Sequence, residues 1–256
     1  MTTINGIPAF TDNYIWLLQN SDDSAYVVDP GDAAPVERAL KERKLSLEGI
    51  LITHHHFDHV GGLKALKDKH RCRVYGPANP AIDGIDQVLV AGDHLNVGDY
   101  SFEIISVPGH TLDHIAYYQA GENPVLFCGD TLFAGGCGRI FEGDPPMMHE
   151  SLCKLAALPA ATAVYCAHEY TLANLAFALA ADPDNAALKE RQRNAQALRT
   201  RGEATVPSTI GLELATNPFL RSAAPELALG LEAAGREAGA KPVEVFAGLR
   251  AWKDQF

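Results

Sequence analysis

The sequence lacks the features of disulfide-stabilised, membrane-spanning and secreted proteins. Its five cysteines are an odd number and contain no Cys-x-x-Cys pair, which argues against a disulfide framework. No uninterrupted apolar run approaches the roughly 18–20 residues that a membrane helix needs. The first residues have neither a positive leader nor a long apolar segment, so no secretory signal is expected. We therefore expect a cytoplasmic protein with no membrane contact.

Basic residues are also few. The chain has 21 Lys and Arg against 32 Asp and Glu, which gives a formal net charge of −11 with neutral histidines. Nucleic acids and anionic lipids both bind basic surfaces, so neither is expected as a partner. We expect a monomer that acts on a small molecule.

The chain changes character near residue 169. It has 256 residues, 47% of them hydrophobic, which is enough to bury a sizeable core. The first 168 residues carry all ten histidines and −10 of the −11 charge, whereas the rest is nearly neutral and rich in alanine. Only the first part contains short apolar runs typical of buried strands. The runs that bear on function are Ile50–Thr53, Phe102–Val107, Val125–Cys128 and Ala163–Cys166.

The second part contains only helical patterns and no convincing strand alternation. The expected helices are Thr171–Ala181, Asn185–Arg201, Pro225–Ala234 and Pro242–Trp252. We therefore predict two domains, 1–168 and 169–256.

The clearest functional motif is Thr53-His54-His55-His56-Phe57-Asp58-His59, directly after the expected strand Ile50–Thr53. In an extended segment His54 and His56 leave the backbone on the same side. Asp58 and His59 fall where the chain must turn. Imidazole and carboxylate are ligands of zinc and similar divalent ions. Four donors in six residues are too crowded for one tetrahedral site, so they favour two adjacent sites, each completed from elsewhere.

Three further strands each end in a potential ligand. His110 follows Phe102–Val107, Asp130 follows Val125–Cys128, and His168 follows Ala163–Cys166. Ligands gathered on loops at a sheet edge are typical of an active site. A lone loop histidine is more often a surface residue, and we assign the other isolated histidines to that class: His70, His94 and His149. His55 and Phe57 are expected to point away from the ligands.

The motif His-x-His-x-Asp-His, followed by His, Asp and His at strand ends, resembles the metallo-β-lactamase superfamily. Other stretches resemble the glyoxalase II (hydroxyacylglutathione hydrolase) family over essentially the whole chain. These stretches are Ile7–Tyr14, Gly129–Phe133, Gly135–Arg139, Ala167–Thr171 and Leu249–Phe256.

This resemblance implies an α/β fold, the αββα metallo-β-lactamase sandwich, followed by a C-terminal helical domain. It also implies two divalent metal ions, with zinc expected and iron or manganese as alternatives. One ion would be held by His54, His56 and His110, and the other by Asp58, His59 and His168. Asp130 would bridge both with a water or hydroxide, so Asp58 and Asp130 are the predicted catalytic residues. Ligating histidines usually have outer carboxylate partners, and Asp29 is our candidate.

The implied reaction is hydrolysis of S-2-hydroxyacylglutathione thioesters, such as S-D-lactoylglutathione to D-lactate and glutathione, in methylglyoxal detoxification. Two ions sharing a water lower its pKa to about 7 and make hydroxide available. The thiolate leaving group, with a reference pKa near 8.5, departs without a strong general acid. The sequence has no Gly-x-Ser-x-Gly elbow for a serine nucleophile. Cys137 is disfavoured as nucleophile because the metals already supply one.

The acidic chain needs local cations to hold glutathione. Arg250 and Lys253 are three residues apart on one helix face, where spacing alone favours a role in complementing the helix dipole. The resemblance instead assigns them to the glycine carboxylate of glutathione, with Arg139 and Tyr170 in the same binding set. Phe141 stands where many relatives have tyrosine.

A second departure is Asp113, which stands where glycine is common in the family. Aspartate tolerates a positive φ better than most residues, if this position requires one.

Three alternatives remain open. An iron-dependent glutathione persulfide dioxygenase on the same fold would use fewer ligands and consume oxygen. A β-lactamase would be expected to carry an export signal and no glutathione motif. A metal-binding module without catalysis would show no turnover.

Overall fold

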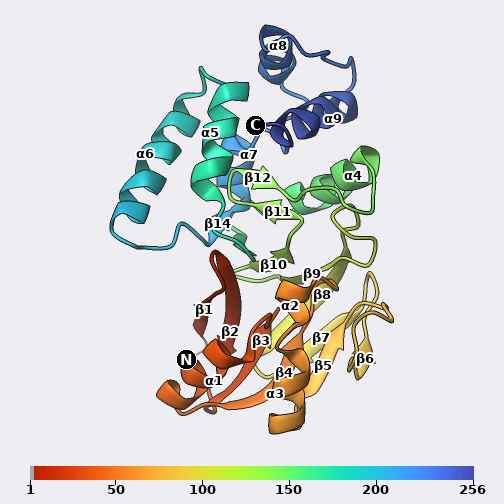
Figure 1. Cartoon of the computed structure of the whole chain (residues 1–256), viewed down its shortest axis with the longest axis vertical. Coiled ribbons are helices and arrows are strands. Elements are labelled where there is room, and N and C mark those ends of the chain that lie inside the picture. Colours follow the sequence, from red (N-terminus) through yellow and green to blue (C-terminus); the bar gives the residue numbers. More distant parts are fainter. Residues whose placement is uncertain (1–2) are drawn as a thin grey trace. The chain divides into compact units, whose positions relative to one another are not determined.

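The computed structural model describes residues 3–256, and the chain divides into two compact units. The first unit comprises the described residues up to Ser106 together with Asp113–Gly129. The second comprises Val107–Leu112 and Asp130–Phe256. Figure 1 labels the helices and strands of both units.

The first unit contains a mixed sheet with strand order β1-β2-β3-β4-β5-β6. Its strands are β1 (Thr3–Ala9), β2 (Asn13–Gln19), β3 (Ser24–Val28), β4 (Ser46–Leu51), β5 (Arg73–Gly76) and β6 (Gln87–Val88). The first three are antiparallel, whereas β3 to β6 are parallel. Parallel neighbours require crossovers. Helix α1 (Ala33–Arg43) joins β3 to β4, and the helices α2 (Phe57–Val60) and α3 (Leu63–His70) join β4 to β5.

Four antiparallel strands of the same unit face this sheet. They are β7 (His94–Val97), β8 (Tyr100–Ser106), β9 (Ile115–Gln119) and β10 (Val125–Gly129). The buried Tyr117 on β9 donates a hydrogen bond to the Ile52 carbonyl beyond β4 at 2.8 Å. On the other face of the first sheet, Val36 and Leu40 of α1 and Leu63 and Leu66 of α3 pack into one apolar core with the strands (Figure 1).

The second unit is mainly helical. Its helices are α4 (Pro145–Ala156), α5 (Thr171–Ala181), α6 (Ala186–Thr200), α7 (Ile210–Thr216), α8 (Pro225–Ala233) and α9 (Pro242–Lys253). Two strand pairs accompany them, β11 (Leu132–Phe133) with β12 (Gly136–Cys137), and β13 (Ala163–Cys166) with β14 (Ser208–Thr209). Leu175 and Ala178 of α5 pack against Leu188 and Ala195 of α6.

The four helices expected after residue 169 correspond to α5, α6, α8 and α9, within two residues at each end. The expectation that no strand follows residue 169 is wrong, because β14 pairs with β13. This strand has two residues, too few for an alternating pattern to be visible. Among residues 3–256, no helix combines the length and the hydropathy needed to cross a bilayer.

Candidate functional site

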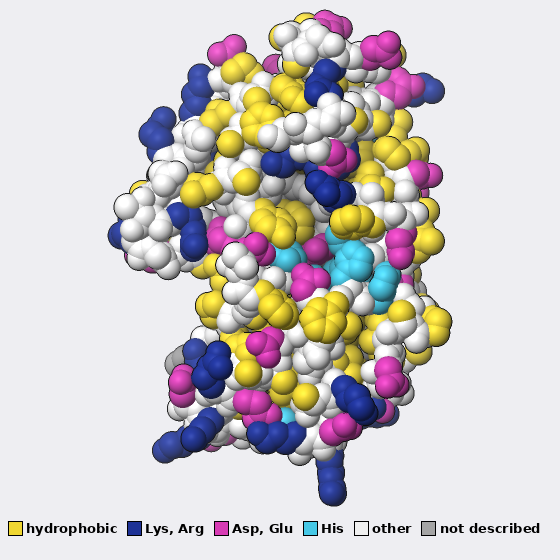
Figure 2. Space-filling view, in the orientation of Figure 1, with side chains coloured by type: hydrophobic (Ala, Val, Ile, Leu, Met, Phe, Trp, Pro, Cys, Tyr) yellow, Lys and Arg dark blue, Asp and Glu magenta, His cyan; other side chains and the backbone are white. Residues whose placement is uncertain are grey.

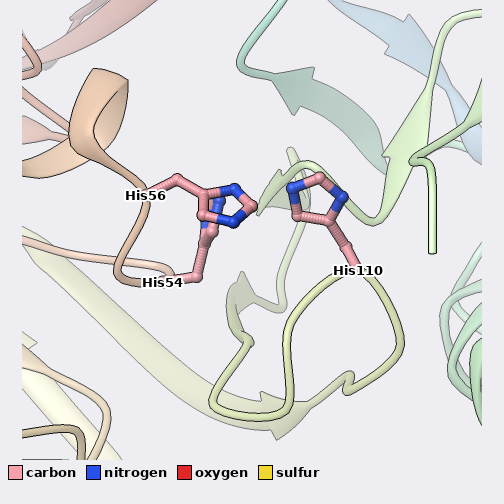
Figure 3. Close-up of side chains that lie close together, drawn as sticks. All are labelled: His54, His56 and His110. Carbon is pink, nitrogen blue, oxygen red and sulfur yellow. The ribbon is translucent and has the colours of Figure 1, made fainter. Parts of the chain in front are cut away.

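The ligand segment lies between β4 and α2 and has no regular secondary structure from Ile52 to His56. His54 is completely buried and His56 is partly buried. Figure 3 shows both rings on the same side of this segment, as the sequence predicts, with their centroids 4.8 Å apart. His55 contacts Asp113 instead, with 2.9 Å between Nδ1 and Oδ1, and Phe57 is exposed.

Asp29 organises the ligand segment from the end of β3. Its carboxylate accepts hydrogen bonds from the Thr53 amide at 2.8 Å and the Thr53 hydroxyl at 2.7 Å, and lies 3.0 Å from His59 Nδ1. Asp29 therefore makes the contact with His59 that is expected of the carboxylate partner of a ligating histidine. Since Nδ1 of His59 is occupied by Asp29, its Nε2 is the atom left to bind a metal, and it lies 3.5 Å from Asp58 Oδ2. Asn13 donates to the same Asp58 oxygen at 2.9 Å.

The other three predicted ligands lie together in the second unit. Asp130 Oδ2 is 3.4 Å from His110 Nε2 and 3.3 Å from His168 Nε2. All three side chains are more than nine-tenths buried. His110 projects from the loop after β8 (Figure 3), and its Nδ1 lies 2.7 Å from the Arg139 carbonyl, which leaves Nε2 as the atom that could bind a metal.

These separations fit metal ligands better than direct ion pairs. A charged N–H···O contact is usually about 2.7–2.9 Å long. Two ligand atoms that each lie about 2.0–2.1 Å from one tetrahedral ion are about 3.4 Å apart. The three imidazole–carboxylate separations given above, 3.3–3.5 Å, therefore match ligands of a shared ion.

All seven predicted ligands occur in groups of His and Asp side chains that could hold a metal ion. The donor set is imidazole and carboxylate only, which suits zinc, iron or manganese. A single Asp130 oxygen between two imidazoles is suited to bridging two ions.

Two predicted substrate contacts surround the second-unit ligands. The ring of Tyr170 stacks on that of His168, with 4.7 Å between the ring centroids and 5° between the ring planes. Phe141 is 61% exposed, and its ring meets His110 edge-on at 5.3 Å. The Phe141 amide also donates to the His110 carbonyl at 3.2 Å, so this loop holds the phenylalanine ring beside a predicted metal ligand.

Two of the three predicted cations, Arg139 and Arg250, contact Asp254, a residue that the sequence analysis did not single out. Arg250 is 6% exposed and donates to Asp254 Oδ1 and to the Cys137 carbonyl, both at 3.0 Å. Arg139 Nε lies 3.4 Å from the same Asp254 oxygen. The buried Nε of Arg250 has no hydrogen-bond partner among the described residues.

Lys253 lies on the same helix. Its ammonium donates to the Ala173 carbonyl at 3.2 Å and lies over the rings of Phe177 and Phe256. Burial, assisted by the charge of Arg250, lowers the pKa of Lys253 below its usual value. The group remains partly exposed and therefore available to an anion.

Cys137 is not suited to nucleophilic attack. Burial raises the pKa of its thiol to about 11, although the nearby Arg250 charge opposes the shift. A thiol with that pKa is protonated at neutral pH and therefore a weak nucleophile. This agrees with the sequence-based preference against Cys137.

His114 is a site residue that the sequence did not single out. It is fully buried, and its ring stacks on that of His54, with 4.5 Å between the ring centroids and 15° between the ring planes. Gly129 lies against it with a φ of +46°, and a Cβ there would come within 2.4 Å of the Thr53 hydroxyl and 2.8 Å of the His114 ring. The only sequence signal for this packing was the glycine directly before Asp130.

Comparison with known proteins gave matches over the whole chain. A family model described as the metallo-beta-lactamase superfamily matches residues 9–168, and one described as hydroxyacylglutathione hydrolase C-terminus matches residues 169–256. A hydroxyacylglutathione hydrolase from Pseudomonas aeruginosa (strain LESB58) is 57% identical, and one from Hahella chejuensis is 50% identical, each covering 100% of both chains. The crystal structure of ETHE1 from Myxococcus xanthus has a TM-score of 0.66 at 23% identity, covering 99% of this chain and 98% of that one, which shows a shared fold.

Proposed function

This chain belongs to the hydroxyacylglutathione hydrolase family of the metallo-beta-lactamase superfamily, and on that premise we propose that it hydrolyses S-2-hydroxyacylglutathione thioesters. The products would be glutathione and a 2-hydroxy acid, D-lactate in the case of S-D-lactoylglutathione, as in methylglyoxal detoxification. The observation that carries this proposal is the position of Asp130 Oδ2, 3.3–3.4 Å from the Nε2 atoms of two histidines.

The proposed cofactor is a pair of divalent ions, with zinc as the expected metal. His54, His56 and His110 would hold one ion, Asp58, His59 and His168 the other, and Asp130 both. When bound, such a pair lowers the pKa of a shared water to about 7 and polarises a carbonyl oxygen.

The chain's own residues orient this chemistry. Asp29 and the Arg139 carbonyl fix the tautomers of His59 and His110, so that Nε2 faces the ions. One oxygen of Asp130 lies close to Nε2 of both His110 and His168, so a single carboxylate orients both imidazole rings. A glutathione thiolate leaves without a strong acid, so no separate proton donor is required of the protein.

The glutathione moiety would be held by Arg139, Phe141, Tyr170, Arg250 and Lys253. Glutathione carries two carboxylates, and the cations on α9 supply opposite charge in a net-acidic chain. We keep residues 1–168 as the catalytic domain and residues 169–256 as the glutathione-binding domain.

We further propose a cytoplasmic monomer with no nucleic-acid or membrane partner. The five cysteines are all free thiols, which is typical of a reducing compartment. Figure 2 shows Lys and Arg side chains scattered among acidic and apolar ones on the face in view, an arrangement unlike the basic stripes that bind phosphate backbones.

The decisive experiment is hydrolysis of S-D-lactoylglutathione by purified protein with metal content measured on the same sample. We expect two ions per chain, loss of activity on chelation and recovery when a divalent metal is added back. Asp130→Ala should lose most activity and about half or more of the bound metal, because both ions lose a ligand. Full activity in a metal-free sample would refute the proposal, and oxygen consumption with glutathione persulfide would favour the dioxygenase instead.

A further inference from the structure

Asp113 lies in the loop between β8 and β9 and does not have a positive φ. The non-glycine residues with positive φ among residues 3–256 are Phe10, Asp23, Asp29, Lys44 and Arg71, and Asp113 is not among them. No backbone requirement for glycine exists at this position, so a side chain is free to take on another role.

Both carboxylate oxygens of Asp113 have partners. Oδ1 lies 2.9 Å from His55 Nδ1, and Oδ2 accepts a hydrogen bond from Asn79 Nδ2 at 2.8 Å. The Asp113 side chain is 7% exposed and that of His55 is 20% exposed, so solvent competes little for these contacts. Asn79 is itself held, because its Oδ1 accepts from the Ala81 amide at 2.9 Å.

His55 lies between two proposed metal ligands in the chain. The backbone from Ile52 to His56 has no regular secondary structure that would hold it rigid. On one side of this segment Asp29 fixes Thr53 and His59. The His55–Asp113–Asn79 chain of hydrogen bonds fixes the middle of the segment from two other loops.

We propose that Asp113, supported by Asn79, is a positioning residue that holds His55 and thereby keeps the flanking ligands His54 and His56 in metal-binding geometry. This inference rests on the proposed metal centre. It does not involve the residues assigned to glutathione, so its expected effect is on metal retention and kcat rather than on KM.

The test uses the full-length protein loaded with metal. Asp113→Ala and Asn79→Ala should each release metal faster to a chromogenic chelator, with affinity lowered about tenfold, at the lower end of what loss of an outer partner costs. At subsaturating metal kcat should fall by a similar factor while KM is unchanged. The thermal midpoint should fall more for the metal-loaded protein than for the metal-free protein.

Two further variants test whether the hydrogen bond between Asp113 and Asn79 is what retains the metal. Asp113→Asn alone leaves one acceptor oxygen for the two neighbours His55 and Asn79, whereas Asp113→Asn combined with Asn79→Asp lets the new amide donate to the new carboxylate while its oxygen still accepts from His55, so the double variant should recover metal affinity. The matched control is Glu37→Ala, which removes the carboxylate partner of His70, 3.0 Å away, on the helices α1 and α3. It should leave metal release unchanged.

Wild-type metal release from Asp113→Ala, or equal destabilisation of metal-free and metal-loaded forms, would overturn the positioning role. Absence of thioester hydrolysis in the wild-type protein would overturn the proposed function instead, while the metal-release assay would still decide the role of Asp113.

Discussion

Phe141 is a proposed substrate contact that lies beside the proposed metal ligand His110. Its ring is exposed and lies edge-on to the ring of His110. The His110 carbonyl accepts from the Phe141 amide, so the ring position depends on the ligand loop. A hydroxyl at the ring tip would add one polar contact at the glutathione site.

We therefore predict that Phe141→Tyr lowers KM about two- to tenfold with little change in kcat. A neutral hydrogen bond contributes roughly 0.5–1.5 kcal/mol net, and it would form equally in ground and transition states. Steady-state kinetics with S-D-lactoylglutathione measure both constants. An unchanged KM would place the ring away from the substrate, and a raised KM would mean that the pocket excludes the hydroxyl.

The site residues that the sequence suggested belong to local motifs, whereas the contacts that it did not reveal join residues far apart in the chain. His54, His56 and Asp58 share a local motif, and Asp29 follows a recognisable strand, so sequence pattern alone suggests each of them as a site residue. Asn13 contacts Asp58 from 45 residues away, and Arg250 contacts Cys137 from 113 residues away. Such pairings exist only after folding, and no local periodicity encodes them.

At the scale of elements, helices were predicted more accurately than short strands. Helix α5 begins and ends where its leucine and alanine pattern predicts, because a buried helix face repeats over several turns. The two-residue strands β11, β12 and β14 carry no such repeat. Their existence depends on the partner strands that supply their hydrogen bonds.

Helix α9 carries buried core residues as well as the two cations proposed to bind glutathione. Pro242 lies in its first turn, and Glu244 accepts a hydrogen bond from the Lys241 amide at 3.0 Å, which defines its start. Its buried residues include Phe246, Leu249 and Arg250, whereas Lys253 remains partly exposed. The two cations near its end, Arg250 and Lys253, therefore differ in burial, although their spacing in the sequence gives no sign of this difference.

For this reason we predict different outcomes for the two α9 variants. Lys253→Ala should raise KM severalfold with the thermal midpoint nearly unchanged. Arg250→Ala should raise KM and also destabilise the fold by about 1–3 kcal/mol, because the buried Cys137 carbonyl loses its donor. Kinetics and thermal unfolding on the same preparations separate these effects.

Lys154 in the last turn of α4 provides the matched control for the helix dipole. Lys154→Ala removes a charge at an equivalent helix end and should leave KM unchanged. If Lys253→Ala behaves like Lys154→Ala in both assays, Lys253 only complements its helix dipole.

At the scale of the whole molecule, the acidic surplus is concentrated in the first 168 residues. Some of these carboxylates hold the elements together outside the metal site. Partial burial alone would raise the pKa of Glu37, but hydrogen bonds from Lys69 and His70 lower it below its usual value. Burial of Asp86 is likewise outweighed by its bonds to Lys67 and the Val74 amide, which lower its pKa. These contacts join α1 to α3 and α3 to β5.

The sign of the resulting pH dependence follows from these lowered pKa values. A carboxyl group with a lower pKa in the folded state binds fewer protons than in the unfolded state. It therefore stabilises the fold above its unfolded pKa, and that contribution is lost as the pH falls through the folded pKa. For Glu37 and Asp86 the loss begins near their reference values of 4.5 and 3.8 and continues below them.

We accordingly predict that the double variant Glu37→Gln, Asp86→Asn is less stable than the wild type at pH 7 and loses less stability between pH 5 and pH 3. Urea unfolding of the metal-free chain at a series of pH values measures both curves. Both proteins retain the same proposed metal ligands, so the titration of those ligands cancels in the difference. The difference in the free energy of unfolding between the two proteins should narrow steadily as the pH falls. A gap that stays constant down to pH 3 would mean that neither carboxyl group has a lowered pKa in the folded state.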